Sequence, residues 1–233
     1  IAGIAVGTVS LPALSKAFKN RNIKKLSNIQ SKSFELSLLL SIPASLGLIL
    51  ASEEIINSLF GYGSFSEKDV KLTADALKYF GYGVPAFALV KILSNFFFAR
   101  DNTKTPLYIS IFMVIINISI SVSLFASYGF IIIPIATSIS TWTGVLIYIY
   151  LLNEKNSLLL NKKLIPNFIK ILASTIIMSI IMVLLINNYE SYLNYSYKFK
   201  AIYLLSIVGF VGIVYLLSCY LFGILKLKDY KTN

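Results

Sequence analysis

The sequence contains no histidine and a single cysteine, Cys219, and these absences exclude several kinds of chemistry. Without imidazole there is no histidine acid or base and no His-ligated metal site. One thiol cannot form an internal disulfide, and Cys219 lies in an apolar run, where a small packing residue is expected. No Walker A, G-x-G-x-x-G or H-E-x-x-H motif occurs, and no pair of acids lies deep within an apolar segment. We therefore predict that this chain is not an enzyme and holds no resident cofactor or metal.

Charged residues are also scarce. They make up 13% of the 233 residues, hydrophobic residues make up 57%, and the mean hydropathy is +0.77. Ordinary globular proteins carry about 25% charged residues, so this chain has too few polar side chains to cover a water-facing surface. In so apolar a chain, the net charge of +11 predicts lysines at a membrane surface and no nucleic-acid partner.

Seven apolar segments approach or exceed the length of about 20 residues that crosses roughly 30 Å of hydrocarbon. They are Ile1–Ala17, Phe34–Leu59, Leu72–Phe98, Leu107–Tyr128, Phe130–Leu152, Ile165–Ile186 and Ala201–Leu225. Because short connections join them, the sequence predicts one all-α, polytopic helical membrane unit. The first run has no basic region before it. We therefore expect that run to be truncated and the chain to be the C-terminal part of a longer protein.

Basic residues favour every second connection between these segments. Fifteen of the 21 Lys and Arg residues fall on one side: Lys16, Lys19, Arg21, Lys24, Lys25, Lys32, Arg100, Lys104, Lys155, Lys162, Lys163, Lys170, Lys226, Lys228 and Lys231. The opposite connections carry nearly balanced charges, and Lys91 alone lies at membrane depth, away from the ends of its span. Since cytoplasmic loops are rich in Lys and Arg, we expect the C-terminus in the cytoplasm and residue 1 near the outer face.

Lys91 is the ionisable residue within a span, and Ser94 and Asn95 follow it on the same helical face. One interpretation is a polar cavity wall on which Lys91 attracts an anionic substrate. The other is a lysine that snorkels to the inner headgroups, since Lys91 lies about 10 Å of helical rise from Phe98.

Asn117 and Ser121 on one predicted span, and Thr137 and Thr141 on the next, form a second polar set. A very short turn joins the two spans, so they must pack as an antiparallel hairpin. These groups either hydrogen-bond across the helix interface, a common use of such residues in bilayers, or line an oxygen-rich site for a monovalent cation.

Several local patterns predict helix ends and close packing. Pro106 and Pro166 are expected in the first turns of their helices, and Ser66 with Asp69 resembles a capping box. The spacings Gly3 to Gly7 and Ser140 to Gly144 indicate close helix approach.

Residues 59–106 combine Leu59–Phe60, Gly63 and Phe65, the acidic helix start at Asp69, Lys91 within a span, and the closing turn Arg100–Asp101–Asn102–Thr103–Lys104–Thr105–Pro106. This stretch resembles the lipid II flippases of the MurJ/MviN family, within the multidrug/oligosaccharidyl-lipid/polysaccharide exporter superfamily. The segment Val6 to Phe18 is similar to the eighth helix of that family.

The resemblance implies a fourteen-helix flippase of which this chain is the C-terminal half. Residues 1–152 would form a transport lobe of five helices, the first one truncated. Residues 153–233 would add two helices that form a groove for the lipid tail, and a cytoplasmic tail. The implied activity is translocation of lipid II, an undecaprenyl-pyrophosphate-linked disaccharide peptide, across the bacterial cytoplasmic membrane for cell-wall synthesis.

The resemblance also implies roles for particular residues and partners. The substrate path would include Lys91, Ser94, Asn95 and Arg100. The cytoplasmic turn typical of the family would include Asp101, Lys104, Thr105 and Pro106. The cation site would include Asn117, Ser121 and Thr137. Ser121 stands where a carboxylate would help. Coupling to a monovalent cation or to the membrane potential is expected, and the partners would be lipid II, membrane lipids and the N-terminal lobe.

Other functions fit the same residues. Within transport, the alternatives are a polysaccharide-lipid flippase or a cation-coupled drug exporter of the same superfamily. A third is a membrane scaffold that transports nothing.

Overall fold

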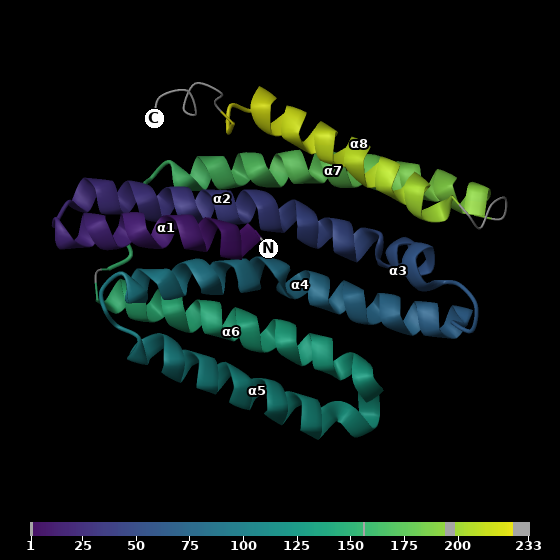
Figure 1. Ribbon diagram of the computed structural model, residues 1–233, viewed down its shortest axis with the longest axis horizontal. Helices are drawn as coiled ribbons and strands as arrows, with labels where there is room; N and C mark the ends of the chain where they lie inside the picture. The colour runs from purple at the N-terminus through teal and green to yellow at the C-terminus, as the bar shows by residue number, and fades with distance from the viewer. Residues whose placement is uncertain (1, 156, 194–198, 226–233) are drawn as a thin grey trace. The chain divides into compact units, whose positions relative to one another are not determined.

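The computed structural model describes residues 2–155, 157–193 and 199–225, and throughout these ranges the regular structure is helical. The helices are α1 (Ala2–Lys19), α2 (Ile23–Leu50), α3 (Ser52–Phe60), α4 (Glu67–Phe98), α5 (Lys104–Tyr128), the 3-10 turn η1 (Gly129–Ile131), α6 (Ile132–Glu154), α7 (Leu164–Leu193) and α8 (Lys200–Leu221) (Figure 1). Apart from the nine-residue α3, seven long helices follow one another, so the predicted all-α fold is confirmed.

Five stretches of the described residues are long and apolar enough to cross a membrane. One of them, Lys104–Glu154, contains both α5 and α6, and α1 is not among the five. This composition identifies the chain as a multi-pass membrane protein, because apolar helices satisfy their own backbone hydrogen bonds and so are stable in lipid.

Hydropathy placed the helices correctly but misplaced some of their ends. The predicted span Phe34–Leu59 is wrong in its bounds, since α2 begins at Ile23 and ends at Leu50, and α3 follows separately. Lys24, Lys25 and Lys32, expected in a loop, therefore lie on α2. Lysine is a good helix former, so a helix can extend beyond its apolar run into water. The basic C-terminal residues Lys226, Lys228 and Lys231 lie outside the described residues.

The helices group into two compact units that share α2 and α4. The first unit comprises Ile1–Ile42 and Tyr82–Ile165, and the second comprises Pro43–Gly81 and Pro166–Asn233. Each unit is thus assembled from parts distant in sequence. The contiguous division into 1–152 and 153–233 that the resemblance implies stays a prediction.

In the first unit, glycines bring helices into direct contact. A Cβ atom on Gly3 would lie 2.7 Å from the Ala88 Cα, so α1 and α4 approach closely at this point. A Cβ on Gly144 would collide with the Met113 side chain, so α6 packs directly against that side chain of α5 at this position. The predicted close helix approach at these small-residue spacings is confirmed.

A hairpin of α5 and α6 forms the edge of this unit (Figure 1). Gly129, with a φ of +63°, ends α5 through its N–H bond to the Phe125 carbonyl. A left-handed C-terminal residue of this kind is usually glycine. η1 then leads directly into α6, so the two helices lie antiparallel.

In the second unit, an apolar cluster joins the short α3 to the start of α4. Ile56, Val70 and Ala74 are buried together, and Phe65 and Leu77 pack against them. The predicted capping box begins α4: the Ser66 N–H donates to Asp69 Oδ2 (3.0 Å), and the Asp69 N–H donates to Ser66 Oγ (3.3 Å). α3 also contacts α8.

Candidate functional site

The predicted substrate path begins on α4, where the structure separates the three polar residues. Lys91 is exposed, and its stem lies beside Gly7 of α1, where an added Cβ would be 3.1 Å from Lys91 Cγ. Asn95 is 2% exposed, and its Nδ2 donates to the Gly7 carbonyl at 2.7 Å. The Ser94 hydroxyl donates to the Lys91 carbonyl of its own helix at 2.9 Å. Asn95 thus links α1 to α4, while Lys91 presents its charge at the surface of this unit.

Arg100 also makes contacts of its own that the sequence did not indicate. Its Nη1 donates to the Phe96 carbonyl at 2.5 Å, its Nη2 donates to the Ser157 carbonyl at 2.9 Å, and its guanidinium lies 5.3 Å from the centre of the Phe18 ring. Burial lowers the pKa of the Arg100 guanidinium, which is still cationic at neutral pH because arginine ionises far above it. The cation therefore fastens α1, α4 and the α6–α7 linker together.

Gln30 of α2 holds the same linker from another direction. Gln30 is fully buried; its Nε2 donates to the Ser157 carbonyl at 3.1 Å, and its Oε1 accepts from the Leu159 N–H at 2.8 Å. The Ser31 hydroxyl accepts from the Asn161 N–H at 2.7 Å. No sequence motif indicated this set, because its members are well over a hundred positions apart.

The turn from α4 to α5 contains four of the predicted residues. Asp101 has a φ of +56°, a backbone conformation that Asp and Asn tolerate better than most residues. Asn102 then caps α5: its Oδ1 accepts from the Thr105 N–H at 3.1 Å, and its Nδ2 donates to Thr105 Oγ1 at 2.9 Å. Pro106 is buried in the first turn of α5, as expected, while Lys104 is exposed. The residue types of this turn have a structural explanation.

The predicted cation site lies at the interface of α5 and α6. Asn117 Nδ2 donates to Thr137 Oγ1 at 2.9 Å, so the predicted hydrogen bond across the hairpin is confirmed. Thr137 Oγ1 donates in turn to the Ile133 carbonyl at 2.7 Å. The buried Ser121 Oγ has no hydrogen-bond partner among the described residues. Binding of a cation here stays a prediction.

Pro85 interrupts α4, and neighbouring helices satisfy two carbonyls of the interrupted turn. Proline has no N–H to give to the Gly81 carbonyl four residues earlier. Within the second unit, the Ser45 hydroxyl donates to that carbonyl at 2.7 Å. Within the first unit, Trp142 Nε1 of α6 donates to the Tyr82 carbonyl at 3.0 Å. Nothing in the sequence indicated which residues would donate to these carbonyls.

The predicted tail groove would be formed by α7 and α8, which expose mainly apolar side chains. Ile169, Ile176 and Ile180 of α7 are each more than half exposed. The Thr175 and Ser218 hydroxyls donate to carbonyls of their own helices. Such faces suit a lipid environment, and the groove itself stays a prediction.

Among the described residues, no three His, Cys, Asp or Glu side chains gather to hold a metal ion. Most of the polar groups described above bond to backbone carbonyls and N–H groups or to one another, while Ser121 Oγ has no partner among the described residues. On α4 the arrangement presents the exposed Lys91, and α7 and α8 present exposed apolar side chains.

Comparisons with known proteins agree on one family. Residues 1–205 match the family described as "Lipid II flippase MurJ". A "Probable lipid II flippase MurJ" of Rickettsia prowazekii is 36% identical over 225 residues, covering 94% of this chain and 44% of that protein. The protein of the same description from Rhizobium tropici is 31% identical, covering 94% of this chain and 40% of that protein.

A solved structure extends the likeness to three dimensions. "Lipid II flippase MurJ, inward closed conformation" superposes with a TM-score of 0.75 at 25% identity, covering 95% of this chain and 43% of that one. The chain spans about half the length of the curated relatives that it matches.

Proposed function

Since the chain belongs to the lipid II flippase MurJ family, we propose that it forms half of a transporter that moves lipid II across the bacterial cytoplasmic membrane. The observation that carries the proposal is the family match over residues 1–205, together with the similarity to a lipid II flippase structure along 95% of the chain. The seven long helices of this chain are half the number in a fourteen-helix flippase.

The proposed mechanism moves the substrate without covalent chemistry. The pyrophosphate headgroup crosses a cationic cavity while the polyprenyl tail stays in lipid, and lobes built from repeats rock to expose each side in turn. Lys91 supplies positive charge to that cavity, since it lies within a predicted span and presents its side chain at the surface of its unit. α7 and α8 offer apolar faces to the tail. By the positive-inside rule, the C-terminus lies in the cytoplasm.

Arg100 contributes to this mechanism by anchoring helices. Two of its five N–H donors go to the Phe96 and Ser157 carbonyls. The remaining donors can still meet a phosphate. Coupling to a monovalent cation at Asn117, Ser121 and Thr137 is part of the proposal, with Ser121 Oγ as the unsatisfied oxygen.

A complementation experiment tests the proposed function. The native gene product, with any residues that precede Ile1, is expressed in a bacterium whose own lipid II flippase is depleted. We expect it to restore growth and cell shape, and we expect charge reversal at Lys91 to abolish rescue at unchanged membrane levels. A wild-type protein that reaches the membrane but never rescues would contradict the proposal, and a scaffold would tolerate the Lys91 change.

A further inference from the structure

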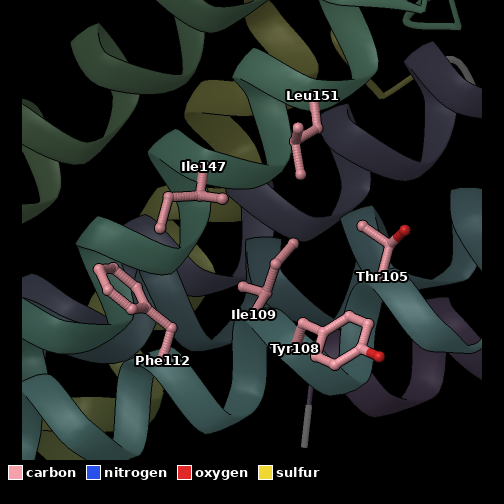
Figure 2. A pocket seen from close by; sticks show the side chains of 6 residues that line it. All are labelled: Thr105, Tyr108, Ile109, Phe112, Ile147 and Leu151. Carbon is pink, nitrogen blue, oxygen red and sulfur yellow. The ribbon is translucent and has the colours of Figure 1, made fainter.

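An open groove lies between α5 and α6 at the end of the hairpin away from its turn. It has a volume of about 390 Å³, within the roughly 300–1,000 Å³ of ordinary ligand sites. Its lining comprises Thr105, Tyr108, Ile109, Phe112, Ile147 and Leu151, which face one another across the space in Figure 2. We call it the α5–α6 groove.

The shape of the α5–α6 groove follows from where the two helices are held together. Near the turn, the Asn117–Thr137 hydrogen bond and the contact of Met113 with Gly144 fix them at close range. Beyond that contact the helices carry larger residues, and the space between them opens. Ile109, 4% exposed, forms the floor, and Phe112, 46% exposed, forms part of the rim.

The walls of this groove are apolar, and the polar groups are at one end. Along α5, positions 105, 108, 109 and 112 share one helical face, and along α6 positions 147 and 151 do so. The Tyr108 ring is 67% exposed, and tyrosine side chains at the ends of membrane helices typically lie at headgroup level. A long apolar chain capped by a polar group would fit this distribution.

Beyond the polar end of the groove, each of the two helical faces that line it carries a lysine. Lys104 lies one turn before Tyr108, and Lys155 lies one turn after Leu151; both are exposed. Glu154 is the acid adjacent to Lys155. Basic pockets between membrane helices bind the headgroups of anionic lipids, with each nearby Lys or Arg contributing about 1 kcal/mol.

We propose that the α5–α6 groove binds one acyl chain of an anionic phospholipid, with the phosphate at the end that carries Lys104 and Lys155. The apolar walls accept the chain, and the two lysines select a negatively charged headgroup over a zwitterionic one. Such a lipid would hold the two helices at a fixed separation where no side chain fills the space between them. The inference does not depend on which substrate the protein transports.

Photocrosslinking from inside the groove tests this inference. The native gene product is placed in nanodiscs of equimolar phosphatidylglycerol and phosphatidylcholine, with photoreactive benzoylphenylalanine at position 147. The matched control carries it at position 146, where Leu146 is 65% exposed outside the groove lining. We expect phosphatidylglycerol to be enriched at position 147, by on the order of fivefold for each lysine involved, and both lipids to crosslink in the bulk ratio at position 146.

Charge variants separate headgroup selection from simple apolar contact. Lys104→Gln and Lys155→Gln should each lower the enrichment at position 147 by roughly fivefold, and Glu154→Gln should raise it. Each variant is first checked for an unchanged melting temperature and elution profile. Equal lipid ratios at positions 147 and 146 would overturn the proposal. Crosslinks from position 147 only to protein or to a polyprenyl lipid would also overturn it. Both of these outcomes are observed with Lys104 and Lys155 unchanged, so they do not depend on whether a lysine variant folds.

Discussion

The buried Gln30 should control the stability of the linker between α6 and α7, because its amide makes both a donor and an acceptor contact with that linker. Gln30→Met keeps a similar length but removes the bonds to the Ser157 carbonyl and the Leu159 N–H. The Ser157 carbonyl keeps its bond from Arg100. The Leu159 N–H loses the only partner described for it. A buried group left unsatisfied costs about 1–3 kcal/mol, and the bond to the Leu159 N–H is only partly buried, so we expect a local destabilisation of about 1 kcal/mol.

Hydrogen exchange reports this change directly. Since exchange of a protected amide follows its opening free energy, about 1 kcal/mol corresponds to exchange of the Leu159 amide that is roughly five times faster. The matched control is Asn28→Ala on the exposed face of the same helix, which should leave that rate unchanged. An unaltered Leu159 rate in Gln30→Met would refute the assignment of Gln30 as the residue that holds the linker.

Three further changes test the packing and the proposed path. Gly144→Ala should destabilise the protein by about 1 kcal/mol, at the low end of overpacking costs, because its methyl group forces the flexible Met113 side chain to move. Gly212→Ala, with open space around it, should not destabilise the protein. Thermal unfolding compares the two variants, and equal melting temperatures would contradict the packing of Met113 against Gly144. If the bond from Asn117 to Thr137 serves packing, Asn117→Ala should lower the melting temperature by the same amount in sodium and in potassium buffers. A decrease in melting temperature that occurs only in sodium would instead favour the cation site. Lys91→Ala should slow lipid II transport by roughly fivefold or more, since one lost charge contact is worth about 1 kcal/mol or more. Lys78 is exposed, and Lys78→Ala should not slow transport. Equal, small effects of the two substitutions would support snorkelling of Lys91.

The sequence was sufficient for the number and order of the seven long helices, although not for the short α3, because an apolar run of membrane-crossing length has few other stable conformations. It also predicted contacts whose geometry is set locally. The Ser66–Asp69 cap spans one helical turn, and the Asn117–Thr137 bond follows from the short connection between two helices. Helix ends were less certain, since the lysines at the start of α2 favour a helix without being apolar.

Contacts between segments that are distant in the chain could not be predicted from the sequence. Asn95 reaches Gly7, and Gln30 reaches Ser157 in the α6–α7 linker, only because the fold brings together segments that are not consecutive in the chain. Polar residues at such positions signal that a partner exists, but they do not identify it. For the same reason, the sequence presented Arg100 as a free cation on the substrate path, and the structure adds its bonds to two backbone carbonyls.

We propose that this chain is part of a transporter that brings lipid II to the outer face of the cytoplasmic membrane. The most direct measurement depletes the native flippase of a host bacterium, expresses the gene product that contains this chain, and labels lipid II with a reagent that cannot cross the membrane. We predict that outer-face labelling returns to the level before depletion, and that it falls again when Lys91 carries a negative charge. Labelling that stays at the depleted level while the protein is present in the membrane would contradict the account.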